Sequence, residues 1–312
     1  METKVVDGAT LKELLPVADA VDALEAAFRD GPMPDAPLRS SLPVAGSDGD
    51  GELLLMPVAG ASVAGVKLLT VVPSNPGRGF PLIQGVYVLF SGAALAPAAV
   101  FDGAALTGLR TAAVSALATR HLAPQGARRL VLFGAGAQAE AHLGAMCAVR
   151  PVEEVVIVDR SPERALRLAE TARATGLDAS MAGPEAVAEA DLICTCTTSP
   201  KPVFDGALLK GGAHVNAVGA YKPDRRELDT ETVARARVVV EARDVAFEEA
   251  GDLLIPIEEG RIGKDHIVAD LGELLRGKAV RQGSEDVTVF ESVGMAYEDL
   301  IIARAATERM SS

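Results

Sequence analysis

The sequence predicts an α/β protein of two domains, one of them built on a doubly wound parallel sheet. Two observations lead to this fold class. The chain has 312 residues, which is more than one typical domain. Its second half alternates buried strand patterns with helical stretches of about 10–15 residues, as parallel strands joined by helical crossovers do. We expect one domain over residues 1–120, completed by a C-terminal helix over 294–312, and a second over 121–293.

Composition and charge narrow the functional class. The chain carries 30 Lys and Arg against 43 Asp and Glu, a net charge of −13, and 49% of its residues are hydrophobic. Such a chain folds into a globular protein, and its surface repels phosphate backbones and anionic lipids. We therefore expect no nucleic-acid and no membrane partner. Three cysteines are too few for a disulfide framework and the N-terminus has no apolar signal-peptide core, so we expect a cytoplasmic protein.

The first domain combines one helix with a sheet or a small barrel. Apolar spacing over residues 11–30 predicts a single amphipathic helix that ends at Gly31-Pro32. Short apolar runs then predict strands, at residues 52–56, 64–72 and 86–90. The stretch 82–101 is uncharged and long enough to raise the question of a membrane span, but Ser91-Gly92 at its centre favours a turn between two strands.

A helix over about 107–122 follows Asp102-Gly103 and leads into the second domain. Buried strands are predicted at residues 129–133, 154–159, 191–197, 214–218 and 238–240. One helix is predicted to follow the run 134–139 and to end at about Val149. Others are predicted from Pro162 to Gly176 and over the last segment, 294–310.

A glycine-rich turn joins the first of these strands to its helix. Gly134-x-Gly136-x-x-Ala139 has the spacing at which backbone N–H groups approach a pyrophosphate. Such a turn is weak evidence alone, but Asp159 ends the next strand, where an acidic side chain accepts hydrogen bonds from a ribose. Together they predict a dinucleotide site. Asp159 favours NAD(H), whereas Arg160 and Ser161 beside it suit the 2′-phosphate of NADP(H), so both cofactors remain open.

Two further groups of residues are candidates for a site. Arg39, Lys67 and Arg110 are cations in or near apolar segments, and a buried cation needs an anionic partner, either a ligand or a structural salt bridge. The loop 219–228 follows a parallel strand at its carboxyl end, where ligands of such sheets bind, although residues 224–227 also fit an ordinary surface loop. The histidines and cysteines lack metal-ligand spacing, so we expect no metal.

Several segments in a fixed order resemble the ornithine cyclodeaminase/mu-crystallin family. The resemblance covers most of the chain, and the combination is specific although no single segment is. The segments are Asp102-Gly-x-x-Leu-Thr-x-x-Arg-Thr-Ala-Ala113, Leu132-Phe-Gly-Ala-Gly-Ala-Gln-Ala139, Asn216-Ala-Val-Gly-Ala220, Pro223-Asp-x-Arg-Glu-Leu228 and Ser292-Val-Gly-Met-Ala296.

The resemblance implies a homodimer formed through the N-terminal domain, a Rossmann domain that binds NAD(H) or NADP(H), and chemistry at the α-carbon of a small amino or imino acid. It implies that Arg39, Lys67 and Arg110 hold the substrate carboxylate. The positions that match cofactor contacts are Thr111, Gly134, Ala135, Gly136, Ala137, Gln138, Asp159, Arg160, Ser161, Thr197, Val218, Gly219 and Ser292.

Two departures from the cyclodeaminase pattern affect the expected reaction. Cyclodeaminases resemble one another in a Gly-Gly-Asp segment whose Asp is the base, and here that run is Gly219-Ala220-Tyr221. Their Glu near a Met-Pro pair aligns with Leu54. The loop is more similar to the mu-crystallin branch, whose members resemble ketimine reductases. That branch favours NADP through Asn-Arg-Thr, where this chain has Asp159-Arg160-Ser161, so we expect NAD(H) first and NADP(H) second.

The expected function is therefore an NAD(P)(H)-dependent oxidoreductase, such as a ketimine or cyclic imine reductase or an amino-acid dehydrogenase. Lys67, Tyr221, Lys222 or a bound water passes the proton, and the sequence does not choose among them. One alternative is ornithine cyclodeamination, with Asp224 as a replacement base. Another is a non-catalytic protein that binds cofactor and ligand without turnover.

Overall fold

The computed structural model describes residues 3–31, 34, 36–46 and 50–310. The chain divides into two compact units, unit 1 with Met1–Arg110 and Met295–Ser312, and unit 2 with Thr111–Gly294. The division therefore falls between residues 110 and 111, ten residues before the boundary that the sequence predicts between residues 120 and 121. No turn marks it, because helix α3 (Gly103–Leu122) is continuous there. Asp102 caps α3 by accepting hydrogen bonds from the Ala104 and Ala105 N–H groups, so the helix begins four residues before the expected Thr107.

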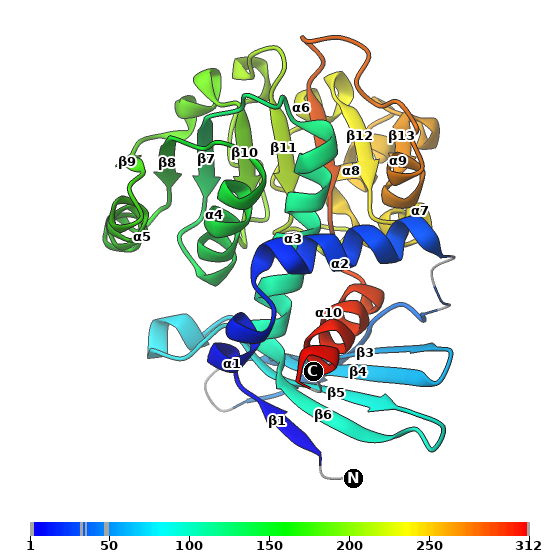
Figure 1. Cartoon of the computed structure of the whole chain (residues 1–312). Helices are drawn as coiled ribbons and strands as arrows, with labels where there is room; N and C mark the ends of the chain where they lie inside the picture. The colour runs from blue at the N-terminus through cyan, green and yellow to red at the C-terminus, as the bar shows by residue number, and fades with distance from the viewer. Residues whose placement is uncertain (1–2, 32–33, 35, 47–49, 311–312) are drawn as a thin grey trace. The chain divides into compact units, whose positions relative to one another are not determined.

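In its described part, unit 1 contains a six-stranded sheet of order β1-β6-β5-β4-β3-β2 (Figure 1). The strands are β1 (Lys4–Val6), β2 (Ser40–Val44), β3 (Gly51–Gly60), β4 (Val63–Val71), β5 (Ile83–Ser91) and β6 (Ala96–Asp102). Strand β1 is parallel to β6 and the other pairs are antiparallel. The sheet is open, so a small barrel is the wrong alternative. The Ser91-Gly92 turn joins β5 to β6 as predicted, and no described helix is long and apolar enough to cross a membrane.

The single helix predicted over residues 11–30 is two helices, α1 (Gly8–Leu14) and α2 (Val17–Asp30). Pro16 separates them, because proline lacks the backbone N–H that a helix interior needs but suits the residue before a helix. The last helix, α10 (Ala296–Arg309), also belongs to unit 1. A short 3-10 helix, η1 (Asn75–Arg78), lies between β4 and β5.

One face of the unit 1 sheet is covered. Helix α10 packs on β3, β4 and β5 and on α2 (Figure 1). Burial alternates along the strands: Leu54, Met56, Lys67 and Tyr87 are buried, and the residues between them are only partly buried or exposed. Because neighbouring residues of a strand point to opposite faces, this alternation places Lys67 on the covered face.

Unit 2 contains an eight-stranded sheet in which every described pair is parallel, of order β13-β12-β14-β11-β10-β7-β8-β9. The strands are β7 (Arg129–Phe133), β8 (Glu154–Val158), β9 (Asp178–Met181), β10 (Leu192–Thr195), β11 (His214–Ala217), β12 (Arg237–Val240), β13 (Ile267–Asp270) and β14 (Thr288–Glu291). The doubly wound parallel sheet is thus confirmed. Strands β9, β13 and β14 have no counterpart among the predicted elements.

Helices alternate with these strands (Figure 1). They are α4 (Ala137–Val149), α5 (Pro162–Ala174), α6 (Thr230–Arg235), α7 (Arg243–Glu249), α8 (Gly251–Glu258) and α9 (Leu271–Leu275), with 3-10 turns η2 (Pro184–Glu189), η3 (Gly206–Leu208) and η4 (Lys264–His266). The strand order reverses between β7 and β10. Ligands of open α/β sheets bind at such a reversal, outside the carboxyl ends of the strands.

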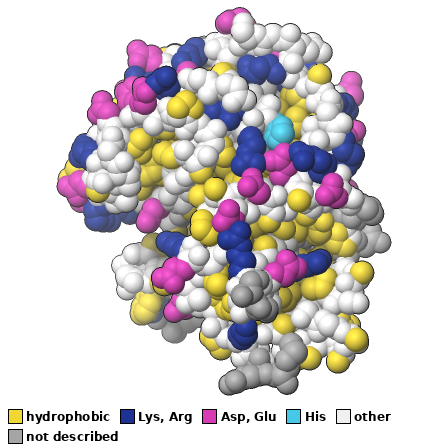
Figure 2. Space-filling view, viewed as in Figure 1, with side chains coloured by type: hydrophobic (Ala, Val, Ile, Leu, Met, Phe, Trp, Pro, Cys, Tyr) yellow, Lys and Arg dark blue, Asp and Glu magenta, His cyan; other side chains and the backbone are white. Residues whose placement is uncertain are grey.

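Charged side chains are mixed over the surface in Figure 2. On this face, described Lys and Arg side chains are interspersed with Asp and Glu side chains on both units. The face therefore lacks the continuous basic stripe that is typical of nucleic-acid binding.

Candidate functional site

The glycine-rich turn follows β7, beside the strand-order reversal. Gly134 has φ +97°, and a Cβ there would lie 2.7 Å from the Cys196 carbonyl oxygen, so the position requires glycine. The turn after β7 thus packs directly against the segment after β10. Gly136 caps α4 and has open space around it. Its exposed backbone suits the close approach of a phosphate group to the helix N-terminus.

Asp159 holds this turn from the end of β8. Its carboxylate accepts hydrogen bonds from the Ala135 N–H (2.9 Å) and the Ser161 N–H (2.7 Å), and the Arg164 guanidinium lies 3.0 Å away. The structure therefore brings together Asp159, Ala135 and Ser161, three of the residues predicted to contact the cofactor. Arg164 joins them, although sequence reasoning did not single it out.

Several buried side-chain polar atoms of unit 2 lack a hydrogen-bond partner. Two of them are Oε1 of Gln138, in the first turn of α4, and Oγ1 of Thr111. Buried polar groups are almost always satisfied, so orphaned ones indicate a ligand or a water. Both residues match cofactor contacts in the resemblance. These atoms and the open glycine turn fit a bound dinucleotide.

Glu227 links the segments that follow β10 and β11. Its buried carboxylate accepts hydrogen bonds from the Thr197 N–H (2.7 Å), the Thr197 hydroxyl (2.6 Å) and the Gly219 N–H (2.7 Å). Two predicted cofactor positions are thus held by one side chain. The sequence treats Glu227 as part of a charged surface loop, and nothing in the local pattern distinguishes it from its exposed neighbours.

Further buried acids support the same edge of the sheet. Asp252 accepts hydrogen bonds from the backbone N–H groups of Glu227 and Leu228, at 2.8 and 2.6 Å. Burial raises the pKa of Glu227, and burial together with the Glu227 charge raises the pKa of Asp252 to about 8. The Glu291 carboxyl is also buried, which raises its pKa. This edge is therefore built from acids that retain protons more readily than exposed carboxyls.

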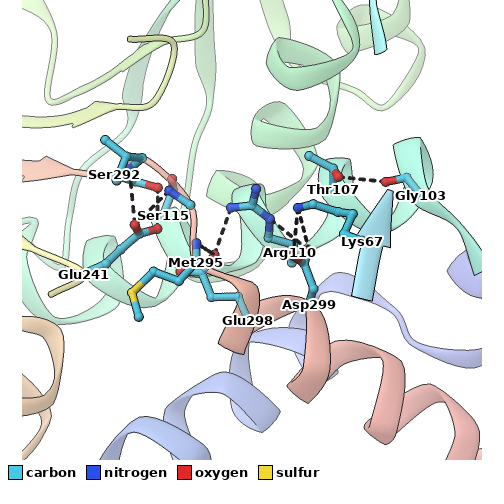
Figure 3. A network of polar contacts seen from close by, with 12 residues as sticks. Lys67, Gly103, Thr107, Arg110, Ser115, Glu241, Ser292, Met295, Glu298 and Asp299 are labelled. Carbon is cyan, nitrogen blue, oxygen red and sulfur yellow. Dashed lines mark hydrogen bonds and ion pairs between the residues drawn. The ribbon is translucent and has the colours of Figure 1, made fainter. Parts of the chain in front are cut away.

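The remaining cofactor positions of unit 2 lie at the same ends of strands. Val218 follows β11, and its N–H donates to the Thr195 carbonyl at 3.2 Å. Ser292 follows β14, and its hydroxyl donates to Glu241 at 2.6 Å (Figure 3). Because Glu241 also accepts from the Gly294 N–H at 2.9 Å, it fixes the backbone after Ser292.

The loop 219–228, which contains the candidate proton donors Tyr221 and Lys222, is partly exposed. Tyr221 is half-buried against the core of unit 2, and the Lys222 ammonium lies 6.0 Å from its ring centroid. Asp224 is exposed. Among the described residues, no group of three or more His, Cys, Asp or Glu side chains is placed to hold a metal ion.

A network of charges lies under α10 in unit 1 (Figure 3). Lys67 Nζ, 1% exposed, lies 2.8 and 3.0 Å from the two carboxylate oxygens of Asp299. The guanidinium of Arg110, 6% exposed, lies 2.9 Å from Glu298 and 3.4 Å from Asp299. The structure thus brings Lys67 and Arg110 together. Sequence reasoning missed both carboxylates, which are contributed by a helix more than 180 residues away in the chain.

Burial controls the protonation of this network. Burial lowers the pKa of Lys67 to about 8, helped by the charges of Arg110 and Arg39 and opposed by Asp299. Arg39 is half-buried in the segment before β2, close enough for its charge to act on Lys67. Tyr87 pairs with Lys67 across β4 and β5, its hydroxyl is buried without a hydrogen-bond partner, and burial raises its pKa.

The cations of this network suit a carboxylate ligand. Lys67 and Arg110 meet at Asp299, and Arg39 is close enough for its charge to act on Lys67. Charge-assisted hydrogen bonds from Arg and Lys would hold a carboxylate strongly. The arrangement can therefore bind and orient a small carboxylic acid.

Removing Asp299 should destabilise the protein strongly. Asp299→Ala leaves two buried cations without their shared counterion, so we expect a loss of about 3–5 kcal/mol in the free energy of unfolding. Denaturant unfolding followed by circular dichroism measures the loss. Asp19→Ala is the matched control: it removes the exposed Asp19–Arg309 ion pair to the same helix and should cost less than about 1 kcal/mol. Equal losses in the two variants would contradict this description.

Comparison with known proteins places this geometry in a family. The model of the ornithine cyclodeaminase/mu-crystallin family matches residues 1–312. A Delta(1)-pyrroline-2-carboxylate reductase of Bacillus cereus is 39% identical over 278 residues, 88% of this chain and 85% of its own. The structure of Thermococcus litoralis Delta(1)-pyrroline-2-carboxylate reductase in complex with NADH and L-proline has 32% identity and a TM-score of 0.93, covering 99% of this chain and 98% of its own.

A second solved structure, an archaeal alanine dehydrogenase dimer with bound NAD, has 30% identity and a TM-score of 0.90 over 100% of this chain and 97% of its own. The match of the family model and these similarities extend over both units. The chain belongs to the ornithine cyclodeaminase/mu-crystallin family.

Proposed function

We propose that this protein is an NAD(H)-dependent reductase of small imino acids. The observation that carries the proposal is the buried network in which Asp299 and Glu298 hold Lys67 and Arg110 together, because two clustered cations suit a substrate carboxylate. Relatives support the reaction class: one is a Delta(1)-pyrroline-2-carboxylate reductase, and a similar structure holds NADH and L-proline. A cyclic imine with an adjacent carboxylate is therefore the first substrate to test, and open-chain ketimines and α-keto acids with ammonia follow.

The residues of this chain bind and orient the reactants. The turn at Gly134 and Gly136 and the carboxylate of Asp159 would hold the pyrophosphate and the ribose, and Glu227 fixes the segments beside them. When bound, NADH supplies a hydride to the carbon of the C=N bond, and the nitrogen takes a proton. Holding the carboxylate on Lys67 and Arg110 orients that carbon, which can lower the barrier by several kcal/mol.

The proton source is part of the same proposal. Lys67 gives up a proton near neutral pH because burial lowers its pKa to about 8. Tyr221, Lys222 and a bound water are the other candidates. Asp224 is exposed, and Gly219-Ala220-Tyr221 stands where cyclodeaminases have their base, so the residue that ornithine cyclodeamination needs is replaced here.

The activity test uses one set of substrates to compare the parent protein with a variant that lacks one cation of the carboxylate site. We expect NADH oxidation with pyrroline-2-carboxylate or an open-chain ketimine. Arg110→Ala should lower kcat/KM about 100-fold because the substrate carboxylate loses a buried cation, while NADH affinity is unchanged. Arg304→Ala, which changes an exposed arginine of unit 1, is the matched control and should keep full activity.

Three results would contradict the proposal. Arg110→Ala, folded and binding NADH, could reduce the imine as well as the parent. Ammonia released from ornithine with NAD, without imine reduction, would indicate a cyclodeaminase. NADH binding without turnover of any imine would indicate a binding protein.

We also propose that the protein forms a homodimer through the open face of the unit 1 sheet. On the face opposite α10, side chains of neighbouring strands form apolar rows, such as Leu55, Leu68 and Val86, which pair across β3, β4 and β5. Val86 is 39% exposed and Leu42, at the edge, 54%. Exposed apolar surface of this kind typically marks a protein interface. The alanine dehydrogenase of similar fold is a dimer.

The three free cysteines suit a reducing compartment, and we propose a cytoplasmic location.

The dimer is tested by its mass in solution. Light scattering should give twice the chain mass of 32.2 kDa for the parent. Val86→Glu places a charge in the apolar row and should yield monomers at micromolar concentration. Leu166→Glu, at an exposed leucine of α5 in unit 2, is the matched control and should remain dimeric. A monomeric parent, or a Val86→Glu variant that stays dimeric, would contradict the proposed interface.

A further inference from the structure

We propose that Arg164 determines whether the protein accepts NADPH in addition to NADH. The inference rests on the proposed dinucleotide site and concerns the end of it where the adenosine ribose binds. It starts from the ion pair between Arg164 and Asp159. The sequence predicts that Arg160 and Ser161 bind a 2′-phosphate, and the structure adds Arg164 to the candidates in this segment.

The carboxylate of Asp159 is fully used in the structure. Oδ1 accepts from the Ser161 N–H at 2.7 Å and from Arg164 at 3.0 Å. Oδ2 accepts from the Ala135 N–H at 2.9 Å and lies 3.4 Å from the same guanidinium nitrogen. A ribose hydroxyl that donates to Asp159 must therefore displace one of these donors. The two backbone N–H groups are fixed by the β8–α5 connection and the glycine turn, so only Arg164 can leave.

Arg164 is free to move. Its side chain is 44% exposed, so water can solvate the guanidinium when it leaves, whereas the Asp159 carboxylate is only 7% exposed. That carboxylate keeps its two backbone N–H donors and gains the ribose hydroxyl, which offsets the loss of Arg164. Once displaced, the guanidinium remains attached to the first turn of α5, directly beside the ribose position on Asp159.

NADPH would need this guanidinium more than NADH does. The 2′-phosphate replaces the hydroxyl that Asp159 would accept from, and it brings negative charge next to a carboxylate. Ser161 is not placed to bind it, because its hydroxyl donates to Glu163 at 2.7 Å and caps α5 by accepting from the Arg164 N–H. Glu163 adds a further negative charge there. Arg164 already reaches Asp159, so its guanidinium can neutralise the carboxylate and bind the phosphate bidentately.

The test measures cofactor binding and does not depend on any substrate. The dissociation constants of NADH and NADPH are measured by titration calorimetry for the parent, Arg164→Ala and Arg164→Lys. We expect Arg164→Ala to weaken NADPH binding about tenfold or more and to change NADH binding less than about threefold. Arg164→Lys should restore part of the NADPH affinity. Arg167→Ala is the matched control, because Arg167 is an exposed arginine on the same helix, and it should leave the ratio unchanged.

Two results would overturn the role of Arg164, and a third would overturn the proposed function. A parent that binds NADH but binds NADPH more than about a hundredfold more weakly would overturn the role of Arg164, and so would an Arg164→Ala variant whose ratio equals that of the parent. A parent that binds neither cofactor would instead overturn the proposed function. Circular dichroism of the exposed variants verifies that each is folded.

Discussion

Burying two cations beneath one helix is the constraint on which unit 1 depends. Lys67 and Arg110 lie in a strand and a helix whose other buried residues are mostly apolar, and a buried cation without a partner is strongly destabilising. Helix α10 supplies Asp299 and Glu298 at this place, which explains why residues 295–312 belong to the first unit, far from their position in the chain. The carboxylates hold the two cations in place beside each other.

Unit 2 depends on a different constraint. The loops at the carboxyl edge of its parallel sheet must keep their backbone accessible to a ligand and still be held in place. Gly134 lets the first turn pack on the segment after β10, and Asp159 and Glu227 fix the neighbouring segments through short hydrogen bonds to backbone N–H groups. Asp252 and Glu291 behind them are buried, which raises the pKa values of both carboxyls. Carboxyl groups therefore support the nucleotide site although the nucleotide itself is an anion. They do so because they accept hydrogen bonds from backbone N–H groups of the loops, and because Asp159 can accept a hydrogen bond from a ribose hydroxyl.

The sequence predicted the features that are local. Strands β7 and β8 were predicted to within one residue, because buried parallel strands are continuous apolar runs, and the glycine turn was predicted from its spacing. The break at Pro16 and the short strands β9, β13 and β14 were missed. The pairing of Lys67 with Asp299 spans 232 positions, and no spacing rule links such residues. Glu227 was missed because its buried contacts depend on how the loop folds back, which its charged neighbours do not reveal.

The central claim is that a charged Lys67 binds the carboxylate of the substrate. The most direct measurement is the inhibition constant of cyclopentanecarboxylate, which has no ionisable nitrogen, against the imine at saturating NADH from pH 7 to 9. Lys67, with its pKa lowered to about 8, is a cation below that pH and neutral above it. Inhibition should therefore weaken as the pH rises through 8, and in Lys67→Met it should be weak at every pH. A parent whose inhibition is the same across this range would contradict the account.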